Sequence, residues 1–154
     1  SVYIRLTAGS NTKVINSKDY KFKIGKAEQI LPGDDVAIIG CGNILGNCLE
    51  AASVLQDKKI QCSVVNMHTI KPIDKEKIKD IARKKKLIVT VEEHNIFGGL
   101  GSSVAEVLAG ERNNCKLVRV GINDFYSSGG GYEYLKNIYG LSVEKIIETV
   151  LKNL

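Results

Sequence analysis

Three adjacent polar residues, Glu92, Glu93 and His94, follow an apolar run and could carry out chemistry. Two carboxylates and an imidazole are suited to general acid–base catalysis or to metal binding. The carboxyl end of a buried strand is also where open α/β sheets contact ligands. However, the only other histidine is His68, and we find no third metal ligand and no nucleophile with an orienting partner. We therefore expect a structural or subunit-contact role for the three residues, and we predict no catalytic residue and no metal ligand in this chain.

A glycine-rich segment, with Gly98, Gly99 and Gly101, follows this polar group and precedes a helical pattern. Free backbone N–H groups at the start of a helix can hold an anion, so a phosphate site is one interpretation. The alternative is that the glycines allow close backbone packing against a neighbouring subunit. We favour the second interpretation because it requires no ligand.

A second glycine group, Gly40, Gly42 and Gly46, comes directly after a predicted strand and suggests a dinucleotide-binding turn. The spacing does not fit that motif, because the third glycine should follow the second by three positions. The next strand also ends in Asn66 where an acidic residue would hold the ribose. A tight turn between a strand and a helix is the better interpretation, and we predict no cofactor-binding residue here.

The cysteines show neither a CxxC pair nor the spacing of metal ligands, and at least two of them fall inside apolar runs. A thiol in such a run behaves as a small apolar side chain, so we interpret the cysteines as structural. Free thiols are typical of a reducing compartment, which favours the cytoplasm. The four residues are Cys41, Cys48, Cys62 and Cys115.

The chain has 22 Lys and Arg residues against 17 Asp and Glu residues, a formal net charge of +5. Its one dense basic cluster, Arg83 to Lys86, lies between a predicted helix and a predicted strand. That position indicates a solvated face rather than a surface that binds nucleic acid. No apolar run approaches the roughly 18 residues that a membrane span requires. We expect neither nucleic acid nor a membrane as a partner.

The elements that must position these residues follow an alternating pattern from Ala27 onward. Apolar runs predict parallel strands at 36–39, 60–66, 87–91 and 116–120, with helical spacing between them. We therefore expect an α/β fold, a three-layer sandwich in which a mainly parallel sheet of about five strands is flanked by helices.

Helix starts are predicted from capping residues, Asp74 for the helix after Pro72 and Ser142 for the final helix. The final helix has the clearest amphipathic stripe in the sequence, which we expect to face the core. Its apolar positions are Val143, Ile146, Ile147, Val150, Leu151 and Leu154.

A domain boundary is predicted near residue 26. Residues 7–25 mix Gly, Ser, Asn, Lys and Asp with scattered apolar positions, a composition typical of a linker. A strand-like run, 2–6, precedes them without a cap or a turn. We expect 1–26 to be the tail of a preceding domain with its linker, 27–154 to be one domain, and the chain to be part of a longer protein.

Taken in order, several motifs resemble the C-terminal domain shared by transketolases, deoxyxylulose-phosphate synthases and the β subunits of 2-oxo-acid dehydrogenases. The strongest are the runs 35–42 (DVAIIGCG), 69–74 (TIKPID) and 91–94 (VEEH), the last followed by the glycine segment. The runs 121–129 and 139–141 are similar to the closing segment of that domain. The segments LTAG (6–9) and IKPID favour transketolase over the other branches of this family.

The resemblance implies a parent enzyme that moves a two-carbon ketol unit between phosphorylated sugars. It implies thiamine diphosphate and magnesium or calcium as cofactors, which are held by two other domains that this sequence lacks. The run 33–35 lacks the second glycine of the diphosphate motif GDG. The resemblance also implies that the chain works with the remaining domains or an N-terminal subunit, in a homodimer, and is inactive alone. The alternatives left open are an assembly domain of a 2-oxo-acid dehydrogenase β subunit and deoxyxylulose-phosphate synthase.

One position departs from the family. Residues 2–9 resemble the last strand of the pyrimidine-binding domain, in which an arginine touches the substrate phosphate, but Ala8 stands at that place. Arg5 resembles another frequent basic position and is our candidate for contacting substrate. In a strand, however, an offset of three points the two side chains to opposite faces.

Overall fold

The computed structural model describes residues 15, 20–112 and 114–154 of the chain. Within them, one sheet has the strand order β1-β3-β2-β4-β5; β1 pairs antiparallel with β3, and the other pairings are parallel. Its strands are β1 (Glu28–Leu31), β2 (Val36–Gly40), β3 (Cys62–Asn66), β4 (Leu87–Asn95) and β5 (Lys116–Ile122). The α-helices are α1 (Leu45–Asp57), α2 (Lys75–Lys84), α3 (Leu100–Ala109), α4 (Tyr132–Ile138) and α5 (Val143–Asn153), and a short 3₁₀ helix, η1 (Gly42–Ile44), precedes α1.

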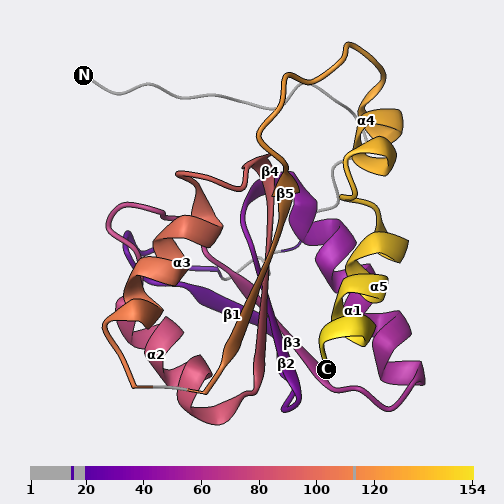
Figure 1. Ribbon diagram of the computed structural model, residues 1–154. Helices are drawn as coiled ribbons and strands as arrows, with labels where there is room; N and C mark the ends of the chain where they lie inside the picture. The colour runs from indigo at the N-terminus through magenta and orange to yellow at the C-terminus, as the bar shows by residue number, and fades with distance from the viewer. Residues whose placement is uncertain (1–14, 16–19, 113) are drawn as a thin grey trace.

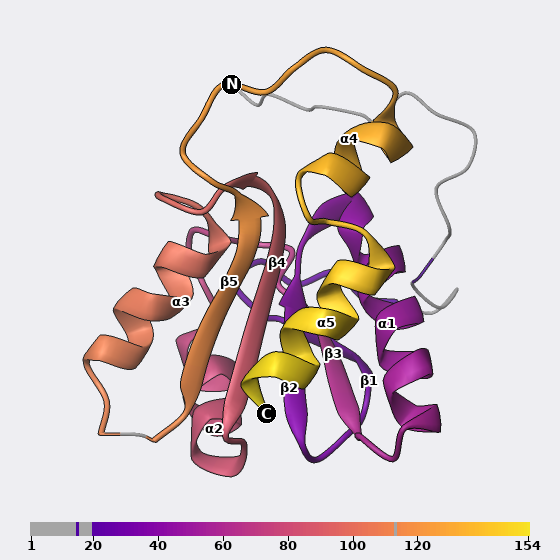
Figure 2. The ribbon, with the colours of Figure 1, turned by 45° about the vertical axis from the view of Figure 1, so that its right-hand side comes forward.

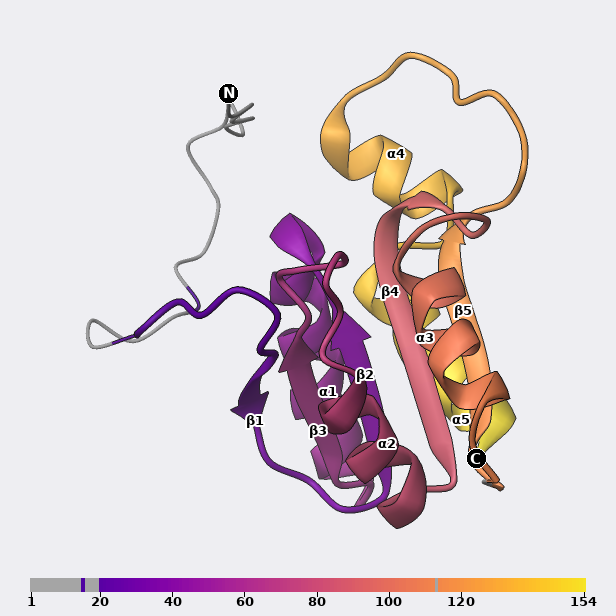
Figure 3. The same ribbon diagram turned by 90° about the vertical axis from the view of Figure 1, so that its left-hand side faces the viewer.

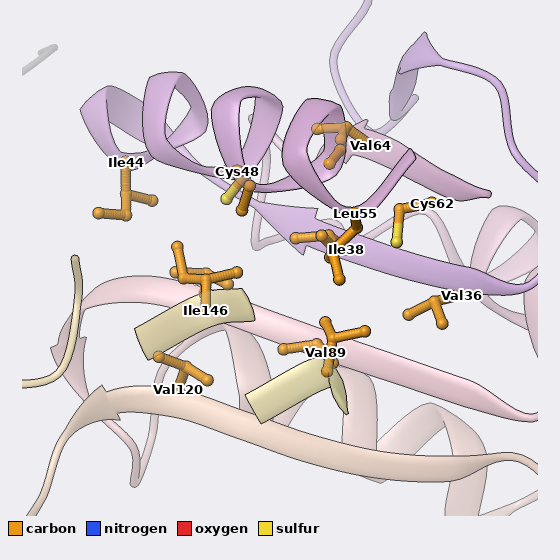
Figure 4. Packing of buried hydrophobic residues seen from close by; sticks show 14 of the residues in the cluster. Val36, Ile38, Ile44, Cys48, Leu55, Cys62, Val64, Val89, Val120 and Ile146 are labelled. Atoms are coloured by element: carbon orange, nitrogen blue, oxygen red, sulfur yellow. The ribbon is translucent and has the colours of Figure 1, made fainter. Parts of the chain in front are cut away.

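The sheet is the middle layer of three, as the sequence predicts. Helices α1 and α5 cover one face, and α2 and α3 cover the other (Figures 1 and 2). Because both faces are covered, the central strand β2 is apolar along its length, and all five of its residues are buried. Alternate residues enter the two cores: Ile38 packs beneath α1 and α5, and Ile39 packs beneath α2 and α3. Figure 4 shows Ile44, Cys48 and Leu55 directed from the helical layer onto the strands.

The four predicted parallel strands are confirmed, with shifted ends. β3 begins at Cys62 rather than at residue 60, and β4 and β5 each extend beyond the predicted end. β4 continues through polar residues because β5 keeps pairing with it: Asn95 is opposite Ile122 after an irregularity that begins at Val91. The fifth strand, β1, was not predicted, because it is a short edge strand of four residues with polar side chains among the apolar ones.

Both predicted N-caps are confirmed. Asp74 accepts a hydrogen bond from the N–H of Lys77 at 3.2 Å, and its other carboxylate oxygen accepts one from the N–H of Ala27 at 3.0 Å, so it also ties the start of β1 to α2. Ser142 accepts from the N–H of Lys145 at 3.4 Å.

The predicted stripe of α5 is only partly buried. Ile146 and Val150 are fully buried, and Val143 and Ile147 pack against the same core. The prediction was wrong for Leu151 and Leu154, which are 46% and 61% exposed because the last turn runs past that core.

Polar residues gather at the carboxyl ends of the parallel strands. There β4 ends in Glu92, Glu93 and His94, α3 begins, and α4 lies beyond the ends of β4 and β5 (Figure 3). In the described part of the chain, no helix is long and apolar enough to cross a membrane.

Candidate functional site

Glu92 is the centre of this polar group and is 2% exposed. Its two carboxylate oxygens accept hydrogen bonds from the N–H groups of Leu100 at 2.6 Å and Gly101 at 2.8 Å. These are first-turn N–H groups of α3, which have no partner within the helix. The carboxylate also lies at the positive end of the helix dipole. Glu92 therefore caps α3 from the neighbouring strand, and both N–H groups are engaged inside the chain rather than offered to an external anion.

The glycines around Glu92 allow close contact within this chain. A Cβ atom on Gly99 would lie 2.0 Å from Oε2 of Glu92, and one on Gly101 would lie 2.7 Å from the Arg119 side chain. Gly121 on β5 would place a Cβ atom 2.8 Å from the carbonyl oxygen of His94. By contrast, a Cβ atom on Gly98 would meet nothing within 4 Å; its φ of +77° is what favours glycine there.

Glu93 points to the opposite face of the sheet, because side chains alternate along a strand. It is exposed and accepts a hydrogen bond from the hydroxyl of Tyr132 on α4. Burial raises the pKa of Tyr132 well above its ordinary value, and the hydrogen bond and the negative charge of Glu93 raise it further. The hydroxyl thus stays a hydrogen-bond donor and joins α4 to β4.

Lys136 makes a second connection from α4. It is 9% exposed, lies 4.7 Å from the Tyr132 ring centroid, and pairs with Glu133 at 2.8 Å. It also donates to Oδ1 of Asn47 on α1 at 3.4 Å. A charged side chain that is this deeply buried needs such partners. We did not anticipate Tyr132 or Lys136, and their local sequence contains no signal for these contacts.

His94 is exposed and lies beside the loop that starts α3. Its Nδ1 atom is 2.8 Å from the carbonyl oxygen of Asn95. Nearby, Arg119 of β5 donates to the carbonyl oxygen of Ile96 at 2.9 Å and lies 5.5 Å from the ring centroid of Phe97, which is 57% exposed. A lone arginine inside a β-branched strand was a signal that could have identified Arg119.

The polar groups of this arrangement are bonded to other groups of the chain. Both oxygens of Glu92 are engaged by backbone groups, and Glu93 is bound to Tyr132. Among the described residues, no three His, Cys, Asp or Glu side chains are grouped so that they could hold a metal ion. Arg5 and Ala8 lie outside the described residues.

Cys41 follows β2 and is half-buried close to the two glutamates. Burial raises the pKa of its thiol to about 11, and the negative charges of Glu92 and Glu93 contribute to the rise. Burial likewise raises the pKa of Cys62 to about 11 and that of Cys48 further still. None of the four cysteines forms a disulfide.

We predict that the native chain resists alkylation. At pH 8 a pKa of about 11 in place of 9.0 lowers the thiolate fraction of Cys41 about 100-fold. Iodoacetamide labelling followed by peptide mass spectrometry should show that slowing relative to the urea-unfolded chain, with Cys48 the slowest. Equal rates in the native and unfolded chains would contradict the burial of these thiols.

Comparison with known proteins agrees with this architecture. The family model described as "Transketolase, C-terminal domain" matches residues 25–146. The chain belongs to the transketolase C-terminal domain family. A relative of this transketolase C-terminal domain, a putative transketolase C-terminal section of Methanocaldococcus jannaschii, is 39% identical over 99% of the chain and 48% of that protein. A solved structure titled split gene transketolase, inactive beta4 tetramer, is 37% identical with a TM-score of 0.88 and covers 94% of this chain and 47% of that one.

Another relative of the domain belongs to a different branch. A 1-deoxy-D-xylulose-5-phosphate synthase of Caldanaerobacter subterraneus subsp. tengcongensis is 34% identical over 98% of the chain and 24% of that protein. The chain thus spans at most about half the length of these relatives.

Proposed function

We propose that this chain is the C-terminal section of a thiamine-diphosphate-dependent transketolase, a cytoplasmic transferase that moves a two-carbon ketol unit between phosphorylated sugars. The observation that carries the proposal is the 39% identity, over 99% of the chain, to a protein named as a transketolase C-terminal section. The deoxyxylulose-phosphate synthase relative is less similar, at 34%, so that activity is the second candidate. Four cysteines that form no disulfide support the cytoplasmic location.

The described residues do not fit the cofactor. Thiamine diphosphate carries a metal that needs several oxygen ligands in near-octahedral geometry, and its ring needs a buried carboxylate. Among the described acidic residues, Glu92 and Asp74 are the two buried as whole residues, and each already caps a helix. In this proposal, thiamine diphosphate and magnesium or calcium are held by the remaining domains or by an N-terminal subunit, and this chain is inactive alone.

Calorimetric titration tests whether the cofactor is bound outside this chain. The isolated chain should show no saturable binding of thiamine diphosphate with magnesium, because one helix N-terminus contributes only about 0.3–1 kcal/mol, whereas micromolar affinity takes about 8 kcal/mol. Combined with the rest of its parent enzyme, it should support both cofactor binding and ketol transfer. A low-micromolar dissociation constant of the chain alone for thiamine diphosphate would contradict the proposed location of the cofactor. A parent enzyme that makes only deoxyxylulose phosphate would contradict the proposed ketol transfer.

We also propose that the end of the sheet near α4 contacts a second copy of the enzyme chain. Glu93, His94 and Gly98 are exposed there, and the exposed aromatic side chains at the same end suit a protein contact. At this end of the sheet, the rings exposed by half or more are Phe97 (57%), Phe125 (50%), Tyr126 (103%) and Tyr134 (59%). In this role Glu92, Gly99 and Gly101 are structural residues that fix the start of α3 beneath the contact surface.

Replacing His94 by alanine should weaken self-association, measured by sedimentation, because His94 lies in that surface while its loss leaves the Glu92 cap in place. Lys152→Ala, on the distant end of α5, is the control and should leave association unchanged. Unchanged association of the His94 variant would argue for a role within the single chain.

A further inference from the structure

The run 69–74 (TIKPID) lies between β3 and α2 and takes no part in the hydrogen bonds of Glu92 and Glu93 given above. The chain segment that leads into β1, residues 20–27, contacts this run. Figure 3 shows this entry segment outside β1, at the edge of the sheet. The contacts between the entry segment and the run indicate what the run does.

Two hydrogen bonds join the entry segment to the run. The N–H of Gly25 donates to Oγ1 of Thr69 at 2.9 Å, and the N–H of Ala27 donates to the carboxylate of Asp74 at 3.0 Å. The Nζ atom of Lys26 also lies 3.7 Å from that carboxylate. The donors of both hydrogen bonds are backbone groups, which almost any sequence supplies. The side chains at positions 69 and 74 therefore decide whether the entry segment is attached.

The entry segment also fits this surface by its shape. The N–H of Lys26 donates to the carbonyl oxygen of Lys23 at 3.1 Å and closes a turn. Gly25, the third residue of that turn, has a φ of +73°, which favours glycine. A Cβ atom there would lie 3.1 Å from Cγ of Pro72, so the turn packs closely on the run.

The contacts of the entry segment outside the core are few. Residues 21–24 are exposed, and the Phe22 ring, 4.6 Å from the ring of His68, is itself 58% exposed. Segments with few buried apolar contacts open at a lower free energy than the core does. Ala27, by contrast, packs on the core beneath α2 and α3. Opening of residues 20–26 therefore leaves that core intact.

Thr69 is suited to control this opening. It belongs to no helix or strand and is half-buried, so its hydroxyl can be removed without disturbing an element of the fold. Asp74 differs, because it also caps α2.

We propose that the run 69–74 fixes the segment through which the preceding domain joins this one, and that this attachment opens independently of the domain core. When closed, it sets the direction in which the preceding part of the chain leaves β1. When open, residues 20–26 become a flexible linker. The inference goes beyond the proposed function, because it holds whichever reaction the parent enzyme catalyses.

Hydrogen exchange of the 154-residue chain, followed by NMR, tests the attachment. Thr69→Val removes the acceptor, so the Gly25 amide should exchange about 5-fold faster, the change that one lost hydrogen bond produces. The amides of Ile38 and Val89, in the central strands, should change less than about 2-fold. Thr69→Ser keeps the hydroxyl and should retain most of the protection.

Thr149→Val is the matched control. Thr149 is another half-buried threonine, and its hydroxyl donates to the carbonyl oxygen of Lys145 within α5 at 2.7 Å. Its replacement removes the same group and should leave the exchange of Gly25 within about 2-fold of the original rate. Gly25→Ala loosens the attachment from the other side, because alanine disfavours the positive φ, and it should speed cleavage after Lys23 about 5-fold.

Trypsin digestion measures the same opening in the parent enzyme, where the bonds after Lys21 and Lys23 lie between the two domains. Both lysines are exposed, so opening of the segment limits cleavage. Thr69→Val should speed cleavage at these bonds about 5-fold, because proteolysis through an open state follows its population. Thr149→Val should change it less than about 2-fold.

Two results would overturn the proposal. The first is a Thr69→Val variant in which exchange at Gly25 or cleavage after Lys23 is unchanged. The second is faster exchange that extends to Ile38 and Val89, because the entry segment would then unfold only with the core.

Discussion

Replacing Glu92 by alanine should lower the free energy of unfolding by about 3 kcal/mol. The substitution leaves the N–H groups of Leu100 and Gly101 buried without an acceptor, and it opens a cavity where a side chain is only 2% exposed. Hydrogen bonds to a charged group contribute about 1.5–3 kcal/mol each, but partial relaxation of the helix start recovers some of the loss. Urea unfolding measures the change directly, and the thermal midpoint should fall by about 6–12 °C.

Two variants calibrate that result. Glu106→Ala removes the same side chain from an exposed position of α3 and should change stability by less than about 0.5 kcal/mol. Glu92→Gln preserves the shape and one acceptor oxygen but sets an amide group against the other N–H, so its loss should fall between those two values. If Glu92→Ala and Glu106→Ala have similar effects, the cap contributes little to stability.

The sequence was sufficient for most of the fold because the apolar patterns are strong. Val36–Ile39 could only be a buried strand, and Asp74 and Ser142 cap helices by a rule that acts over three residues. β1 escaped prediction because its order depends on pairing with β3, more than thirty residues later in the chain. Leu151 and Leu154 fit the helical period, but periodicity does not say how far the core extends along the helix.

The site was predicted as a set of residues but not as a set of contacts. Glu92 caps α3 from a strand eight residues upstream of Leu100, whereas the local capping rules examine the position held by Gly99. The contact of Glu93 with Tyr132 spans 39 residues and exists only because α4 folds back over β4. The subunit contact through His94 and the substrate role of Arg5 stay predictions.

Gly99→Ala should destabilise the chain by about 2–3 kcal/mol. A substitution at an ordinary surface position usually changes stability by about 0.5 kcal/mol or less. The backbone at Gly99 is extended, with φ −103° and ψ −151°, so backbone conformation is not the obstacle. The obstacle is space, because the new Cβ atom would lie 2.0 Å from Oε2 and 3.0 Å from Cδ of Glu92. That carboxylate cannot move aside without losing its bonds to α3. Gly46→Ala is the matched control: nothing lies within 4 Å of its Cβ position in α1, and alanine there should be neutral or stabilising by about 0.5–1 kcal/mol.

Combining the two substitutions tests whether the clash acts through the carboxylate. If Gly99→Ala destabilises by displacing Glu92, it should cost much less once Glu92 is already alanine, because the atom 2.0 Å away no longer exists. Only the milder approach to Nδ1 of the exposed His94, at 2.9 Å, would remain. The double variant should therefore be about 1–2 kcal/mol more stable than the sum of the single losses predicts. Additive losses in urea unfolding would show that Gly99 is required for the loop itself, and that the close approach to Glu92 does not account for it.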